Sequence, residues 1–265
     1  MSNINTLLAG STGLVVRPPQ IPSPSPPQPP LTQPLQQGSN ILTTLLSHPS
    51  IAHTSAFTRR ALPHTSNKLS PLPASPSPDQ DAAALWPTLI ASATPAPSLY
   101  LSALGTTLAQ AGNAAAQRLI DYDLNLALAR AAKAAGVSTY VLVSTAGASS
   151  GSSFAYPKMK GELEEAVRAL DFDHTVILRP GLIVGERADA RPAEFVLRKV
   201  AGFAGCVGNG LKDFWAQDAE VIARAAVAAG VQCAEGKREK GVWEVAQKDI
   251  VRLGRTEWGV EEEQK

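Results

Sequence analysis

Short apolar runs alternate with amphipathic, helix-like stretches along this 265-residue chain. The apolar runs have the length of buried strands, and they lie at 4–9, 56–58, 99–104, 140–143, 175–178 and 242–245. Apolar residues three and four apart predict helices between them, at 41–46, 121–135, 156–170 and 218–229. Weaker signals predict a strand near 68–69 and a short helix near 82–85. Strands that alternate with helices predict a mainly parallel sheet covered on both faces, which is a Rossmann-type, doubly wound α/β fold.

The first predicted strand runs directly into a glycine turn, Gly10-Ser11-Thr12-Gly13. In a dinucleotide-binding unit, such glycines bend the chain and let the backbone approach a pyrophosphate, which then faces the N–H groups of the following helix. Gly10, Ser11, Thr12 and Gly13 are therefore candidate cofactor-binding residues. The alternative is an ordinary strand–helix turn, because a lone glycine motif is weak evidence.

A segment rich in proline, glutamine and serine, residues 16–37, separates this turn from the helix that should follow it. Its prolines exclude a helix and the interior of a sheet, so we predict an exposed insert without regular structure. When the insert is left out, the turn continues into Gly38 and reads G-x-x-G-x-x-G, with Gly38 as the third cofactor-binding glycine. Ser39 or Asn40 is the predicted N-cap of the next helix.

Two arginines, Arg59 and Arg60, follow the second predicted strand, and no acidic residue stands beside them. An acidic residue at this position holds the ribose hydroxyls of NAD, whereas arginine suits the 2′-phosphate of NADP. With the insert subtracted, Arg59 follows Gly13 at close to the roughly 20 residues expected for this contact. The two arginines therefore predict NADP(H) as the cofactor, with a solvated basic pair as the alternative.

Tyr156 and Lys160 are four residues apart on a predicted helix, so they share one face. A nearby ammonium group lowers the pKa of a phenol, which lets tyrosine exchange a proton near neutral pH. Ser144 and Thr145 end the preceding strand and could hydrogen-bond a substrate carbonyl. These four residues are the candidate catalytic group, and an amphipathic surface helix is the alternative interpretation.

The composition narrows the classes of function. A formal net charge of +1, with acids and bases interspersed, predicts neither nucleic-acid binding nor strong attraction to an anionic membrane. Cys206 and Cys233 indicate a reducing compartment, and neither the cysteines nor the four histidines have the spacing of a metal site. No apolar run reaches the length of about 18 residues that predicts a membrane span, and the first residues do not look like a secretory signal or a cleaved presequence. We therefore expect one domain, residues 1–260, interrupted by the insert and followed by an acidic tail, 261–265.

Several motifs together resemble the atypical short-chain dehydrogenase/reductases. In particular, they resemble the fungal proteins of the mitochondrial outer-membrane proteome, which are related to the animal Tat-interactive oxidoreductase-like protein. The motifs cover nearly the whole chain apart from the insert, and they are Ser102-Ala103-Leu104-Gly105-Thr106-Thr107, Ile120-Asp121-Tyr122-Asp123, Ser144-Thr145, Tyr156 with Lys160-Gly161-Glu162, Leu178-Arg179-Pro180-Gly181, Arg191-Pro192-Ala193-Glu194 and Asp213-Phe214-Trp215.

For the cofactor, the resemblance implies that NADP(H) contacts the glycine turn, the two arginines, and the strand end formed by Leu104, Gly105 and Thr106. It also implies peripheral attachment to the cytosolic face of the mitochondrial outer membrane. The small-molecule substrate and the oligomeric state are left open.

For the chemistry, the resemblance implies that Tyr156 donates the proton and that Lys160 binds the nicotinamide ribose and poises the tyrosine. Ser144 or Thr145 would orient the carbonyl. Many reductases of the wider family carry an asparagine where Asp121 stands in this chain, so a standard proton relay does not follow from the resemblance.

The leading hypothesis is thus an NADP(H)-dependent oxidoreductase that acts on a carbonyl or an alcohol. The rival is a nucleotide-binding regulatory or scaffold protein with little turnover, which Asp121 and the interrupted turn favour. A third possibility is that the chain with its insert binds no nucleotide. The insert departs from the relatives, and its ends, Val16-Arg17 and Gln36-Gln37, are compatible with a retained intron; a genuine loop insertion is the alternative.

Overall fold

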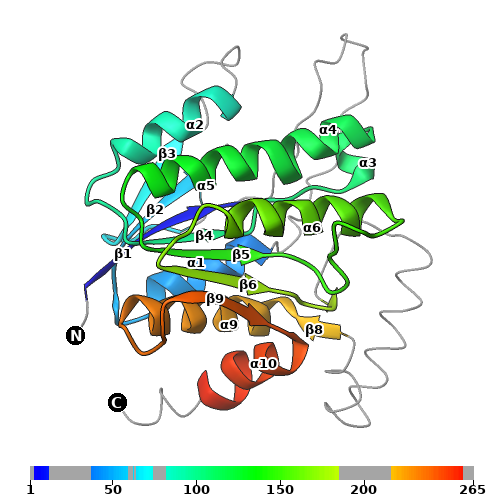
Figure 1. The fold of residues 1–265 in the computed structure, drawn as a ribbon. Coiled ribbons are helices and arrows are strands. Elements are labelled where there is room, and N and C mark those ends of the chain that lie inside the picture. Colours follow the sequence, from blue (N-terminus) through cyan, green and yellow to red (C-terminus); the bar gives the residue numbers. More distant parts are fainter. Residues whose placement is uncertain are drawn as a thin grey trace, which may run out of the picture.

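A computed structural model describes residues 3–11, 37–58, 62, 64–73, 82–184 and 216–258. Its main element is a seven-stranded parallel sheet in the order β3-β2-β1-β4-β5-β6-β9 (Figure 1). The strands are β1 (Ile4–Ala9), β2 (Ile51–Thr58), β3 (Leu69–Pro73), β4 (Leu99–Ser102), β5 (Thr139–Val143), β6 (His174–Leu178) and β9 (Gly241–Val245). The order reverses between β1 and β4, the switch point at which doubly wound folds bind their ligands. The predicted Rossmann-type fold is therefore confirmed.

Helices cover both faces of the sheet (Figure 1). One face is covered by α1 (Gln37–Ser47) and α9 (Ala219–Ala234), and α9 in turn carries α10 (Gln247–Val251) and the π-helical turn η2 (Arg252–Thr256). The opposite face is covered by α2 (Ala82–Ala91), α5 (Asn125–Ala134) and α6 (Ala155–Arg168). Two short helices, α3 (Leu108–Ala111) and α4 (Ala114–Arg118), and the π-helical turn η1 (Leu119–Leu124) lead into α5. In the described ranges, no helix combines the length and the apolar character needed to cross a bilayer.

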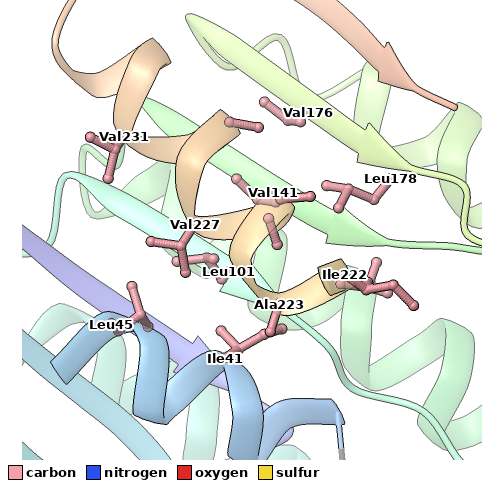
Figure 2. Packing of buried hydrophobic residues seen from close by; sticks show 14 of the residues in the cluster. Ile41, Leu45, Leu101, Val141, Val176, Leu178, Ile222, Ala223, Val227 and Val231 are labelled. Atoms are coloured by element: carbon pink, nitrogen blue, oxygen red, sulfur yellow. The ribbon is translucent and has the colours of Figure 1, made fainter. Parts of the chain in front are cut away.

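The alternation of side chains along each strand divides the core into two halves. In β1, Ile4 and Leu8 join the cluster beneath α1 and α9, whereas Leu7 and Ala9 join the cluster beneath α2, α5 and α6. Figure 2 shows the first cluster, in which α1 and α9 lie over the aliphatic side chains of β4, β5 and β6. This double burial explains why the strands are continuous apolar runs in the sequence.

Three predicted boundaries need correction. Helix α1 begins at Gln37, so the last residue of the predicted insert is helical and Ser39 and Asn40 lie inside the helix rather than at its N-cap. Their carbonyl groups accept hydrogen bonds from the hydroxyl groups of Thr43 and Thr44 instead. Strand β2 begins at Ile51, five residues before the predicted start, because it pairs with β1 on one side and β3 on the other. The remainder of the insert, 16–36, lies outside the described residues.

The weakest sequence signals belong to elements that depend on their neighbours. Strand β3 contains Pro71 and Pro73, which a sheet accepts only at an edge, and β3 is the edge strand next to β2. The short strands β7 (Leu182–Val184) and β8 (Ala216–Asp218) pair in parallel outside the main sheet, and neither was predicted. Three residues are too few to show a periodicity.

Candidate active site at the carboxyl ends of β1, β4 and β5

The glycine turn brings the ends of β1 and β4 together at the switch point. Gly10 has φ +95°, and a Cβ added to it would lie 2.6 Å from the carbonyl carbon of Ala103, so only glycine fits this crossing. Ser11 is buried, and its hydroxyl donates to the carbonyl of Phe57 in β2 at 2.7 Å. Both predicted residues therefore lie at the switch point between β1 and β4.

The other predicted cofactor residues divide into three groups. Gly38 lies in the first turn of α1. Thr12 and Gly13, like Arg59 and Arg60, lie outside the described residues, so their roles stay predictions. The segment Leu104–Thr106 is described in full; β4 ends at Ser102, two residues before the predicted strand end, so this segment lies just beyond the strand.

Two buried polar residues hold the backbone of Leu104–Thr106 in place through hydrogen bonds. Asn125, at the start of α5, donates to the carbonyl of Leu104 at 3.1 Å and accepts from the hydroxyl of Ser102 at 2.6 Å. Asp121, in the π-helical turn η1, accepts from the backbone N–H of Thr106 through Oδ2 at 2.8 Å. A Cβ on Gly105 would lie 3.1 Å from Oδ1 of Asp121, so glycine keeps this approach open. The sequence predicted an α-helix that begins at Asp121, but residues Leu119–Leu124 form a wider π-helical turn instead. Such turns are frequent at functional sites.

Tyr156 and Lys160 both lie in the first half of α6, as predicted, but in different environments. The Tyr156 side chain is at the surface, with 40% of the residue exposed, whereas Lys160 is only 2% exposed. The Lys160 ammonium group donates to the carbonyl of Val143, the last residue of β5, at 3.2 Å. Burial lowers the pKa of Lys160 below its ordinary value, and the nearby Asp121 and Glu164 carboxylates oppose that shift. The ammonium group is thus held at the carboxyl end of β5, one helical turn from the phenol.

Close packing fixes the start of α6. A Cβ on Gly161 would lie 2.2 Å from the carbonyl carbon of Ser149, so the loop after β5 rests directly on the helix. The N–H of Ser149 also donates to the carbonyl of Pro157 at 3.1 Å, and the Ser150 hydroxyl donates to Glu165. The loop that follows the predicted hydroxyl residues is therefore tied to the turn that carries Tyr156.

Ser144 and Thr145, which the sequence did not separate, differ in their contacts. The Ser144 hydroxyl is buried and donates to Oε1 of Glu164 at 2.5 Å. The Thr145 hydroxyl is partly buried, and its contact is a long one, 3.5 Å, to the carbonyl of the next residue. Thr145 thus has the hydroxyl that is better placed to change partners, while Ser144 is held by α6.

Glu164 and Arg179 are site residues that the sequence reasoning did not assign. Glu164 is 1% exposed and receives three hydrogen bonds from the Arg179 guanidinium, at 2.5 to 3.2 Å, in addition to the one from Ser144. Arg179 follows β6 and also bonds Glu244 of β9 at 2.8 Å. One signal was available: Glu164 continues the i, i+4 spacing of Tyr156 and Lys160 on the buried side of an amphipathic helix.

A pocket elsewhere in the molecule does not belong to this site. It measures about 470 Å³ and lies at the opposite end of the sheet, where His174 begins β6 and residues 237–241 lead into β9. Its basic side chains already have partners, since Lys237 pairs with Glu235 and Lys240 with Asp173. No cluster of metal-ligating side chains occurs among the described residues. The segment 185–215, which separates β7 from β8, lies outside them.

Comparisons with known proteins agree with this picture. The HIM1 family model matches residues 93–204. "Protein fmp52, mitochondrial" of Aspergillus clavatus is 47% identical over 220 residues, which are 82% of this chain and 93% of that protein. "Protein fmp-52, mitochondrial" of Neurospora crassa is 41% identical over 261 residues, 96% of each chain.

Solved structures share the fold at low sequence identity. The UDP-Glc/GlcNAc 4-epimerase of Campylobacter jejuni has a TM-score of 0.60 at 15% identity, covering 97% of this chain and 84% of its own. The Bordetella bronchiseptica enzyme WbmG in complex with NAD has a TM-score of 0.56 at 17% identity, covering 92% and 73%. Likeness at this identity establishes the fold and leaves the activity to the site.

Proposed function

This chain belongs to the family of the fungal mitochondrial fmp52 proteins, and from that premise we propose that it is an NADP(H)-dependent oxidoreductase acting on a carbonyl or alcohol substrate. The observation that carries the proposal is the buried ammonium group of Lys160, held at the end of β5 one helical turn from the exposed Tyr156. Burying a charge costs free energy, and buried charged groups with perturbed pKa values cluster at functional sites.

The described residues fit a nicotinamide dinucleotide. Gly10 permits the close backbone crossing at the switch point, and the backbone from Leu104 to Thr106 is held rigidly beside it. A bound cofactor would supply or accept the hydride, and Lys160 would hold its ribose. NADP(H) rather than NAD(H) rests on Arg59 and Arg60 alone.

The chain's own residues would then transfer one proton to or from the substrate oxygen. During carbonyl reduction, the Tyr156 hydroxyl donates its proton to the oxygen on which negative charge develops, and the Lys160 ammonium group stabilises the phenolate that remains. The Thr145 hydroxyl donates a hydrogen bond to the same oxygen and orients it. Ser144 serves a different purpose, because its hydroxyl holds α6 through Glu164. In alcohol oxidation, the phenolate takes the proton back.

The proposed location is supported by the names of the relatives, which are called mitochondrial. We propose that this protein is also mitochondrial and attaches peripherally to the cytosolic face of the outer membrane. Protease treatment of intact mitochondria should then degrade it, and alkaline carbonate should release it from the membrane. Protection from protease until the outer membrane is opened would place it inside instead.

Cofactor binding is tested by titrating NADPH and NADH into the full chain and into a variant that lacks residues 16–36, which leaves α1 intact from Gln37. We expect the shortened variant to prefer NADPH. A charge-assisted contact to phosphate contributes about 1.5–3 kcal/mol, so changing Arg59 and Arg60 to alanine should weaken NADPH about ten- to a hundredfold and leave NADH unchanged. Arg224→Ala, on the exposed side of α9, is the matched control. Equal affinity for the two cofactors before mutation would contradict the NADP(H) assignment.

A turnover assay distinguishes the oxidoreductase hypothesis from the regulatory or scaffold hypothesis. NADPH consumption is followed with a panel of aldehydes, ketones and quinones, using whichever form binds NADPH. Consumption with any of them supports the oxidoreductase. Tight NADPH binding without consumption across the panel would favour the nucleotide-binding regulatory or scaffold protein.

A further inference from the structure

Three side chains with formal charges are buried in the described part of the chain: Asp121, Lys160 and Glu164. A buried charge is tolerated only when an opposite charge and hydrogen bonds compensate for its lost hydration. Glu164 is compensated, because the Arg179 guanidinium bonds both of its carboxylate oxygens. Asp121 and Lys160 are the remaining buried anion and cation. The Glu164 carboxylate also lies near Lys160, but the Arg179 guanidinium already neutralises it.

These two charges lie at neighbouring strand ends. Strands β4 and β5 pair with Ser102 opposite Leu142, so the segment after β4 that contacts Asp121 runs beside Val143, which holds Lys160. We propose that Asp121 is the counter-ion that keeps Lys160 in its ammonium form, which makes it a positioning residue for the machinery of the proposed function. An amide in place of Asp121 could accept the Thr106 hydrogen bond equally well, but it would carry no compensating charge.

In this role Asp121 acts on the Lys160 ammonium group through space, without a direct hydrogen bond. Its Oδ2 has the Thr106 N–H, whereas its buried Oδ1 has no hydrogen-bond partner in the described structure. Burial raises the pKa of Asp121 from 3.8 to about 6, and the Lys160 charge opposes the increase. The other ionisable groups around Lys160 are Tyr156, Glu164 and Arg168 on its own helix and Arg179 after β6, and both arginines lie within ion-pair distance of Glu164. From α5, the buried and neutral Asn125 amide donates to the carbonyl of Asp121 at 3.2 Å.

A double-mutant cycle tests the proposal without any ligand. The variants Asp121→Asn, Lys160→Met and the double variant are unfolded with urea at pH 7. Each single change should strand a buried charge and lower the folding equilibrium constant. The double variant leaves no buried charge uncompensated. Its folding equilibrium constant should therefore fall by a factor at least tenfold smaller than the product of the two factors measured for the single variants. If a single variant does not fold, folding of the double variant supports the proposal. Effects that multiply, or a double variant that is the least stable of all, would overturn it.

A control cycle pairs Glu164→Gln with Lys160→Met. Because Arg179 compensates Glu164, the coupling in this cycle should be clearly smaller than that between Asp121 and Lys160. Equal coupling in the two cycles would show that any nearby carboxylate compensates the Lys160 charge, which would contradict the proposed role of Asp121.

A second readout connects the pair to the cofactor. NADPH affinity is measured against pH in the form that binds it. It should fall at alkaline pH as Lys160 loses its proton, and in Asp121→Asn this fall should begin about one pH unit lower or more, because a lost anion favours the neutral amine. Lys160→Met should show no such fall, and an unchanged pH profile in Asp121→Asn would overturn the proposal. Absence of NADPH binding in every form would count against the proposed function, while the urea cycle would still decide on the ion pair.

Discussion

The two faces of the sheet are packed by different chemistry. Beneath α1 and α9 the cluster is almost entirely aliphatic, and α9 contributes mostly alanine and valine (Figure 2). Beneath α2, α5 and α6 the cluster contains aromatic rings, and the buried charges Asp121, Lys160 and Glu164 all belong to η1 or α6 on this side. They gather near the ends of β4, β5 and β6, where the candidate site lies.

This difference separates packing from function within one sheet. Aliphatic burial contributes stability in proportion to area and carries no chemistry. A buried ion pair often stabilises less than apolar residues of the same volume would, so buried charges are weak evidence of a contribution to stability. We therefore expect mutations on the two faces to have different effects. Mutations on the aliphatic face should change stability alone, whereas mutations on the charged face should change both stability and the properties of the site.

The largest effect is expected from the surface end of the charged face. Tyr156→Phe keeps the ring and deletes only the hydroxyl, so turnover should fall about 10²–10⁴-fold while NADPH affinity and stability change little. Turnover is measured as NADPH consumption with a carbonyl substrate, and NADPH affinity is measured by fluorescence titration. The matched control is Tyr122→Phe on η1, whose ring lies 4.2 Å from the Arg118 guanidinium and outside the proposed chemistry. Wild-type turnover in Tyr156→Phe would show that the catalytic assignment is wrong.

The next effect concerns the buried carboxylate that holds the site together. Glu164→Gln removes the buried carboxylate that bonds Arg179 and weakens the bond to Ser144. Arg179 keeps Glu244 as a partner, so the cost should lie at the lower end of the range of about 3–5 kcal/mol expected when one member of a buried pair is removed. The free energy of unfolding in urea measures this loss. Glu220→Gln breaks an exposed pair with Arg224 on α9 and should cost no more than about 0.5 kcal/mol. Similar losses in the two variants would remove the distinction between buried and exposed pairs here.

A comparable substitution on the aliphatic face sharpens the contrast. Leu101→Ala, in the middle of the cluster shown in Figure 2, should cost about 2–5 kcal/mol, because it leaves a cavity between β4 and α9. NADPH affinity of the folded protein should not change. Val242→Ala, at a position that is 51% exposed, should have little effect on either quantity. A lost NADPH affinity in Leu101→Ala would show that the faces are not independent.

The smallest effect is a pH dependence of stability that comes from Asp121. Its pKa is raised in the folded protein from 3.8 to about 6, so the folded state binds this proton more tightly than the unfolded state does. The contribution therefore stabilises the fold below about pH 4 and is lost as pH rises through 6, by at most about 3 kcal/mol. Urea unfolding at pH 4.5 and pH 7 should show this loss in the wild type and not in Asp121→Asn. Equal pH dependence in both would contradict the assignment to Asp121.

Much of the site could be predicted because it uses local patterns. Tyr156 and Lys160 are joined by helical spacing, and Gly10 is identified by its place after an apolar strand. The roles of Ser144 and Thr145 could not be separated, because the distinction depends on Glu164, which approaches from another element. Arg179 and Glu244 are likewise distant in sequence from the residues that they hold.

The sequence by itself determined the order of the main-sheet strands and the larger helices along the chain, the parallel sheet, and the helix that carries the tyrosine and lysine. The strands and helices follow from periodicity within single segments, and the parallel sheet follows from their alternation. Only the tertiary structure decided which buried charges compensate each other. Arg179 bonds Glu164, which leaves Asp121 and Lys160 as the other two buried charges at neighbouring strand ends, and this division depends on how α6 and η1 meet the ends of β4, β5 and β6. Charge compensation acts through space over a few ångströms, and spacing along the chain does not encode it.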